Sequence, residues 1–108
     1  MDLSFNNIVD IHKVAFSRLT ALKELILNDN SIAELPFTEI NQCKGLKLIN
    51  LTSNQLYILP TLWKVSYIEA RNNPLRLVTS ELHRLPHLEF ITFDWLDYLI
   101  DTEPQSLE

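Results

Sequence analysis

Glycine and cysteine are scarce in the sequence, with one residue of each, Gly45 and Cys43, in 108. Phosphate-binding loops and dinucleotide-binding turns need several glycines at fixed spacing, so the sequence excludes both kinds of site. One cysteine cannot form a disulfide within the chain. Neither a nucleotide-binding loop nor a disulfide framework can therefore be part of this stretch.

Positive charge is also scarce. Nine Lys and Arg residues stand against 14 Asp and Glu residues, which gives a formal net charge of -5 at pH 7. No cluster of basic residues provides a surface for phosphate groups. The sequence therefore predicts no nucleic-acid partner.

Long apolar runs are missing, although 46% of the residues are hydrophobic. No run approaches the length of about 20 residues that a helix needs to span a bilayer, so we predict no membrane partner. Residues 1–6 show neither the basic nor the apolar segment of a secretory leader. Together with the single cysteine, these absences predict a cytoplasmic location.

What the sequence does contain is a repeated apolar frame that ends in asparagine. Three copies run Leu22-x-x-Leu25-x-Leu27-x-x-Asn30, Leu46-x-x-Ile49-x-Leu51-x-x-Asn54 and Val65-x-x-Ile68-x-Ala70-x-x-Asn73. A truncated copy opens the chain as Leu3-x-x-Asn6, and a fifth, Leu88-x-x-Ile91-x-Phe93, lacks the asparagine. Starting points of the last four copies lie 24, 19 and 23 residues apart. Such repeats predict a solenoid, because one unit is too small to bury its own apolar face.

Each copy contains a short segment that alternates inward and outward, as a strand with one buried face does. The predicted inward residues are Leu25, Leu27, Ile49, Leu51, Ile68, Ala70, Ile91 and Phe93. At the turn that follows, a buried amide can donate to carbonyls of one coil and accept from an N–H of another. We expect a structural ladder of Asn6, Asn30, Asn54 and Asn73.

We interpret residues 1–108 as one domain, with repeats at about 1–21, 22–45, 46–64, 65–87 and 88–95. A short helix is expected between Thr38 and Lys44. Apolar spacing over residues 94–101 predicts a helical cap on the last coil, and residues 102–108 form a polar tail. The first copy lacks a cap, which indicates either an excerpt with flanking domains or self-association through the N-terminal edge.

The repeats resemble the leucine-rich repeat family from Met1 to Phe93. The Asn-x-Ile-x-x-Leu-Pro run at 30–36 and the Asn-x-Leu-x-x-Leu-Pro run at 54–60 are similar to intracellular, Ras-group repeats. This resemblance implies an α/β solenoid, a short right-handed superhelix with a parallel concave sheet and 3-10 or short helices on the convex side. It also implies protein binding, often within larger signalling proteins. The 19-residue spacing and Ala70 depart from the family's pattern.

Outward residues form columns across the concave sheet if the strands stack in register. Aromatic residues beside Arg71 have the composition of a binding hot spot. The alternative is that the cap covers Phe90 and Trp95, while Tyr67 only fills out the sheet. The predicted partner-binding residues are Glu24, Ile26, Asn28, Leu48, Asn50, Thr52, Tyr67, Glu69, Arg71, Phe90, Thr92, Asp94 and Trp95.

Few residues are candidates for metal binding. His83 and His87 have the i, i+4 spacing of zinc ligands on a helix, but Pro86 lies between them and ends a helix there. His12 lies far from both in the sequence. We therefore interpret the histidines as solvated loop residues and predict no metal and no cofactor.

Nucleophilic catalysis and glycosylation have equally weak support. Cys43 lies at an inward position with no base nearby, and a buried thiol of this kind is inert, so we predict no enzyme activity. Asn50-Leu51-Thr52 is a formal N-glycosylation sequence. It needs a secretory route and lies in the presumed binding face, so it is set aside.

The sequence thus favours a non-enzymatic module that binds a protein partner through its concave sheet. The alternative is a recognition or regulatory segment of a larger signalling protein, such as a kinase, GTPase or phosphatase assembly. A third hypothesis is a structural role in which the N-terminal edge stacks on another copy.

Overall fold

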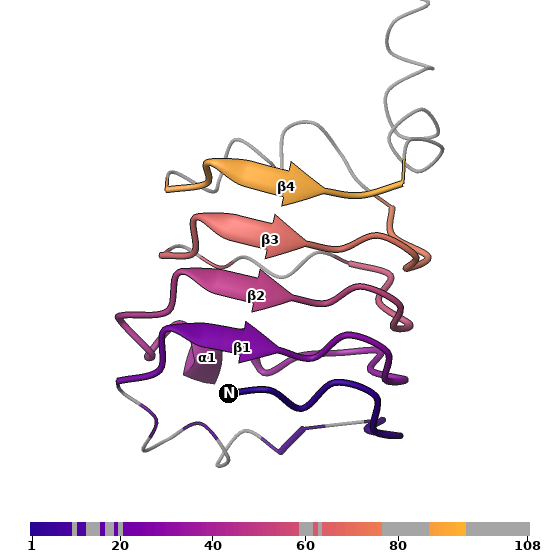
Figure 1. Ribbon diagram of the computed structural model, residues 1–108, viewed down its shortest axis with the longest axis horizontal. Coiled ribbons are helices and arrows are strands. Elements are labelled where there is room, and N and C mark those ends of the chain that lie inside the picture. The colour runs from indigo at the N-terminus through magenta and orange to yellow at the C-terminus, as the bar shows by residue number, and fades with distance from the viewer. Residues whose placement is uncertain are drawn as a thin grey trace, which may run out of the picture.

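The computed structural model describes residues 1–9, 11–12, 16, 19, 21–58, 62, 64–76 and 87–94. Strands β1 (Glu24–Ile26), β2 (Leu48–Asn50), β3 (Tyr67–Glu69) and β4 (Phe90–Thr92) form one parallel sheet in chain order. Figure 1 shows them stacked one above another, with the N-terminus beside β1. The predicted parallel sheet is therefore confirmed.

The hydrophobic alternation fixes the register, because a shift of one residue would turn every buried side chain outward. Leu25 pairs with Ile49, and Ile49 pairs with Ile68, so inward residues stack on inward residues. An isolated bridge between Asp2 and Ile26 adds the first coil to the same ladder. There the N–H of Ile26 donates to the Met1 carbonyl at 2.9 Å.

The core lies on one side of the sheet and consists of the inward residues together with residues of the return segments. The buried core residues are Phe16, Leu25, Leu27, Ile32, Leu35, Ile40, Cys43, Leu46, Ile49, Leu51, Leu56, Leu62, Val65, Ile68, Ala70 and Leu75. Ile91 and Phe93 are only partly buried. This difference from the prediction follows because, among the described residues, β4 has a neighbouring strand on one side alone.

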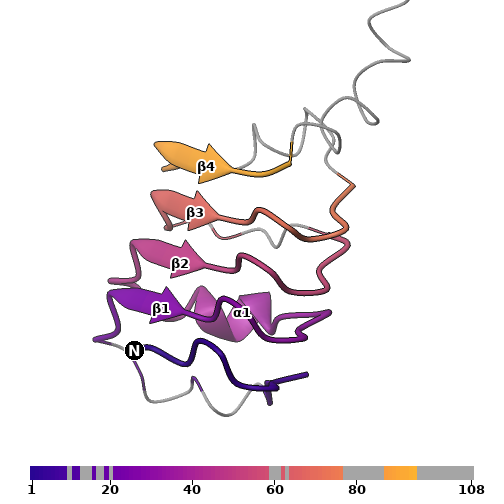
Figure 2. The same ribbon diagram turned by 45° about the vertical axis from the view of Figure 1, so that its right-hand side comes forward.

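The return segment after β1 contains the helix α1 (Phe37–Ile40). Pro36 precedes it, and its fixed φ of -75° suits the start of a helix. Ile40 and Cys43 are both buried, as the sequence predicts. Figure 2 shows α1 behind the sheet, on the core side. The shorter return between β2 and β3 inserts Leu62 into the same core.

Three buried asparagines tie neighbouring coils together. Asn54 Nδ2 donates to the carbonyls of Leu27 at 2.9 Å and Leu51 at 3.0 Å, which belong to two different coils. Its Oδ1 accepts the N–H of Ile32 at 3.0 Å. Asn30 and Asn73 have the same bonding pattern in their own coils. Each amide thus satisfies backbone groups that the turn leaves open.

Asn6 differs from these three because its side chain is exposed. Among the described residues, its Nδ2 donates only within its own coil, to the carbonyls of Leu3 at 2.9 Å and Ser4 at 3.1 Å. Most of the predicted cap (residues 94–101) and the whole tail (102–108) lie outside the described residues. No helix in the described part of the chain is long and apolar enough to cross a membrane.

Candidate protein-binding face

The side of the sheet opposite the core carries every predicted partner-binding residue that the structure describes. We call this surface, formed by Glu24, Ile26, Asn28, Leu48, Asn50, Thr52, Tyr67, Glu69, Arg71, Phe90, Thr92 and Asp94, the outer sheet face. The cross-strand pairs place the predicted columns in register. Glu24, Leu48, Tyr67 and Phe90 form one row of neighbours, and Ile26, Asn50, Glu69 and Thr92 form the next. Trp95 lies outside the described residues.

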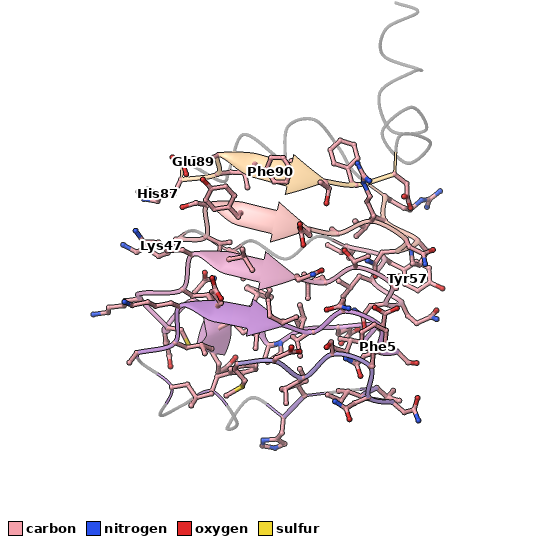
Figure 3. All side chains as sticks on the ribbon, viewed as in Figure 1. Phe5, Lys47, Tyr57, His87, Glu89 and Phe90 are labelled. Carbon is pink, nitrogen blue, oxygen red and sulfur yellow. The ribbon has the colours of Figure 1, made fainter. Side chains whose placement is uncertain are left out.

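Two aromatic rings meet on this face. The ring centroids of Tyr67 and Phe90 are 6.2 Å apart and their planes are inclined by 40°. This distance lies within the range of favourable aromatic pairs. Both side chains keep nearly half of their surface exposed, 44% for Tyr67 and 48% for Phe90. The pair therefore leaves apolar ring surface in water. Figure 3 labels Phe90 on β4.

A hollow of about 520 Å³ opens on the outer sheet face beside Phe90. Its lining combines one aromatic ring with amide, hydroxyl, carboxylate and guanidinium groups. The lining residues are Asn28, Asn50, Thr52, Glu69, Arg71, Phe90 and Thr92. All seven belong to the predicted partner-binding set. Glu24, Ile26, Leu48, Tyr67 and Asp94 lie on the same face but do not line the hollow.

The residue before each ladder asparagine adopts a left-handed backbone conformation, which the sequence interpretation missed. The φ angles are 56° at Phe5, 61° at Asp29, 59° at Ser53 and 57° at Asn72. Asp and Asn tolerate this region better than other non-glycine residues. An Asx residue directly before the repeated asparagine was therefore a usable signal at two of the four positions.

Side-chain hydrogen bonds hold this bend at the end of the strands. Asn72 Nδ2 donates to Ser53 Oγ at 3.0 Å, and the Asn72 N–H donates to Asp94 Oδ2 at 3.0 Å. In the earlier coil, Asn28 Nδ2 donates to the Asp29 carboxylate at 2.6 Å. These bonds fix one border of the outer sheet face, so its shape is set before any ligand arrives.

Two titratable groups have environments that change their pKa. Hydrogen bonds from the Ser4 hydroxyl and N–H hold the pKa of the exposed Asp2 carboxyl below its ordinary value. Burial raises the pKa of the Cys43 thiol. Because the thiolate is the reactive form, this shift makes Cys43 a poor nucleophile.

The structure describes two of the three histidines. His12 and His87 are both exposed, and His83 lies outside the described residues. Figure 3 shows His87 beside Glu89 at the start of β4, at the end of the strands away from Tyr57. Over the described ranges, no group of three or more His, Cys, Asp or Glu side chains could hold a metal ion.

Three relatives can be compared over most of this chain. Epiphycan from Gallus gallus is 35% identical over 108 residues, which are 100% of this chain and 28% of that protein. Opticin from Bos taurus is 32% identical over 105 residues, 95% of this chain and 33% of that protein. Tsukushi from Mus musculus is 36% identical over 88 residues, 81% of this chain and 25% of that protein. The chain spans about a third or less of each relative.

The prediction of a cytoplasmic location is wrong. Epiphycan, opticin and tsukushi are secreted, extracellular proteins. The prediction used two absences, of a leader and of paired cysteines, and a resemblance to intracellular repeats. Absences of this kind do not decide the compartment, because a leader and a disulfide are each local features of a sequence.

A comparison with protein families independently supports the repeat frame and the fold. The family model described as leucine rich repeat matches residues 1–56, which is more than half of the 108 residues. The matched stretch contains β1, α1, β2 and two of the three buried asparagines. The chain belongs to the leucine-rich repeat family.

Proposed function

We infer that this chain is a non-enzymatic module that binds a protein partner through the outer sheet face, in an extracellular setting. Membership of the leucine-rich repeat family supports protein binding in general. The similarity to secreted proteins supports the setting, and it gives no support to a signalling assembly inside the cell.

One observation carries the choice of surface. The exposed Tyr67–Phe90 pair lies beside a polar hollow on a side of the sheet that none of the described elements covers. Aromatic and Arg side chains that can be desolvated together are the usual anchors of protein interfaces. The strands hold these side chains in place, so little conformational entropy is lost on binding.

Affinity capture with a double variant tests the proposal. The wild-type chain and a Tyr67→Asp, Arg71→Glu variant are immobilised and exposed to extracellular matrix extract, and retained proteins are identified by mass spectrometry. Each candidate is then purified and titrated against both forms. We expect the variant to weaken binding by about tenfold or more, the effect of losing one or two hot-spot residues.

The chain offers a matched control in Tyr57→Asp, Arg76→Glu. Both control residues are exposed, and they follow the ladder asparagines instead of lying on the outer sheet face. Figure 3 shows Tyr57 beyond the ends of the strands. The control variant should bind as the wild type does, and circular dichroism should show that all forms fold. Equal loss in both variants, or no loss in either, would contradict binding through the outer sheet face.

A further inference from the structure

The asparagine in the middle of the outer sheet face belongs to a sequence that the protein-binding proposal does not use. Asn50-Leu51-Thr52 is the single Asn-x-Ser/Thr sequence in the chain. Such a sequence accepts an N-linked glycan when the protein passes through the secretory route. The similarity to secreted proteins supports passage through that route. The surroundings of Asn50 on the outer sheet face then decide whether the structure can accommodate a glycan.

In the described part of the chain, the Asn50 side chain makes one hydrogen bond, through its oxygen. Its Oδ1 accepts the N–H of Thr52 at 3.1 Å, which fixes the plane of the amide. Its Nδ2, the atom that carries a glycan, donates no hydrogen bond within the described part of the chain. Leu51 between them is fully buried, so Asn50 and Thr52 both emerge on the same side of the sheet.

The other asparagines of the repeat provide an internal contrast. Nδ2 of Asn30, Asn54 and Asn73 donates to three backbone carbonyls each, at 2.8 to 3.4 Å. Those amides are buried and hold the coils together. The side-chain amide of Asn50 is half-buried, and within the described residues its one hydrogen bond is made by its oxygen. Substitution of its Nδ2 breaks no hydrogen bond among the residues that the structure describes.

The hollow provides room for the first sugar. Asn50 and Thr52 both line this space of about 520 Å³. Asn28, Glu69 and Arg71 line it too and supply donors and acceptors for sugar hydroxyl groups. Asn50 is half-buried between its cross-strand neighbours Ile26 and Glu69, but it lines the hollow, so its side chain faces open volume.

We propose that Asn50 is an N-glycosylation site and that a glycan there closes the outer sheet face to a protein partner. In the transfer, Asn50 Nδ2 forms a bond to the anomeric carbon of a lipid-linked oligosaccharide. The bond from that carbon to the lipid pyrophosphate oxygen breaks, and the pyrophosphate leaves with the electron pair. Nδ2 loses one proton to the transferring enzyme. No oxidation or reduction is involved.

The second half of the proposal rests on the proposed function, whereas the first half does not. A glycan on Asn50 occupies the hollow and lies over Arg71 and Phe90, so it competes for the surface that a protein partner needs. The bare chain binds its partner, and the glycosylated chain does not. Occupancy of one side chain then sets the fraction of molecules that can bind.

The site is tested by expressing the full chain behind a secretory leader in mammalian cells and analysing its peptides by mass spectrometry. We expect a glycan on Asn50 that peptide N-glycosidase removes, leaving Asp at position 50. Thr52→Ser keeps the acceptor sequence and should keep the glycan. Asn50→Gln and the isosteric Thr52→Val should both lose it. A secreted wild-type chain with unmodified Asn50 overturns the proposal.

Variants that fail to fold do not weaken this test. Translation in the presence of microsomes gives the same readout on the emerging chain, as a mass increase that an endoglycosidase reverses. The increase is expected for wild type and Thr52→Ser and is absent for Asn50→Gln. Its absence from the wild type in both systems overturns the site.

Closure of the face is tested by titrating one purified partner against two forms of the wild-type chain, the glycosylated chain from mammalian cells and the bare chain from bacteria that lack N-glycosylation. We expect the bare chain, which keeps Asn50, to bind about tenfold or more tightly than the glycosylated chain, since the glycan covers hot-spot residues. Equal affinity overturns the closure. If no form binds a partner, the proposed function fails while the glycan data still decide the site.

Discussion

The two faces of the three-residue strands differ in how much the residue type varies from one strand to the next. On the core side, the central residues Leu25, Ile49 and Ile68 are all aliphatic and fully buried. One residue earlier, the outer sheet face carries Glu24, Leu48, Tyr67 and Phe90 in a single row. Burial restricts the first set to apolar side chains that fit the core, whereas solvent accepts nearly any side chain in the second. The fold is therefore specified on one face, and function can change on the other.

The largest effect that tests this comparison is expected from the buried ladder. Asn54→Ala leaves the buried N–H of Ile32 without its acceptor and removes the hydrogen bonds to the carbonyls of Leu27 and Leu51. Asn30 Nδ2 and Asn73 Nδ2 still donate to these two carbonyls. An unsatisfied buried donor costs roughly 1–3 kcal/mol and each further lost hydrogen bond roughly 1 kcal/mol, so the free energy of unfolding should fall by roughly 3–5 kcal/mol. Urea denaturation followed by circular dichroism measures the loss.

Asn6→Ala is the control for this substitution. Asn6 occupies the same position of the frame, but it is exposed and bonds only within its coil. We expect a loss of less than about 1 kcal/mol. Similar losses for both variants would show that the bonds between coils add nothing to those within a coil.

An intermediate effect is expected from neighbouring residues of β2. Ile49→Ala opens a cavity in the core and should cost roughly 2–5 kcal/mol, since Ile49 is fully buried. Leu48→Ala removes a half-buried side chain from the outer sheet face and should cost about 1 kcal/mol or less. Thermal and urea unfolding of the two variants measure the difference. A larger loss for Leu48→Ala would assign the outer sheet face a structural role.

The smallest effect is expected from the aromatic pair. A double-mutant cycle with Tyr67→Ala and Phe90→Ala should give a coupling energy of roughly 0.5 kcal/mol, the low end for aromatic pairs, because both rings are exposed. The unfolding free energies of the four forms give this value. A coupling above about 1.5 kcal/mol would mean that the pair stabilises the sheet and is not kept free for a partner.

Much of the sheet could be predicted from the sequence. The frame around Leu25, Ile49 and Ile68 has a period of two, and only one register puts all of these residues inside. The helix expected between Thr38 and Lys44 forms as α1, one residue earlier at Phe37, since Pro36 starts it. The partial burial of Ile91 could not be predicted, because it depends on which neighbours a strand has in space.

The candidate site could be predicted only in part. Alternation places Tyr67 and Phe90 on one row, but their 6.2 Å ring contact and their exposure depend on side-chain geometry. The left-handed conformation at Phe5 and Ser53 had no signal in the residue types, since neither favours it. The role of Tyr67 and Phe90 in binding a partner stays a prediction.

The sequence by itself determined the repeat, the parallel sheet and which side of each strand is buried. It could do so because hydrophobic periodicity is a local property that recurs in every copy of the repeat. Only the tertiary structure decided that the amide nitrogen of Asn54 donates to two coils, while that of Asn50 donates to none of the described residues and lies at a hollow. Both side chains are asparagine amides, and their different surroundings come from residues more than 15 positions away in the sequence.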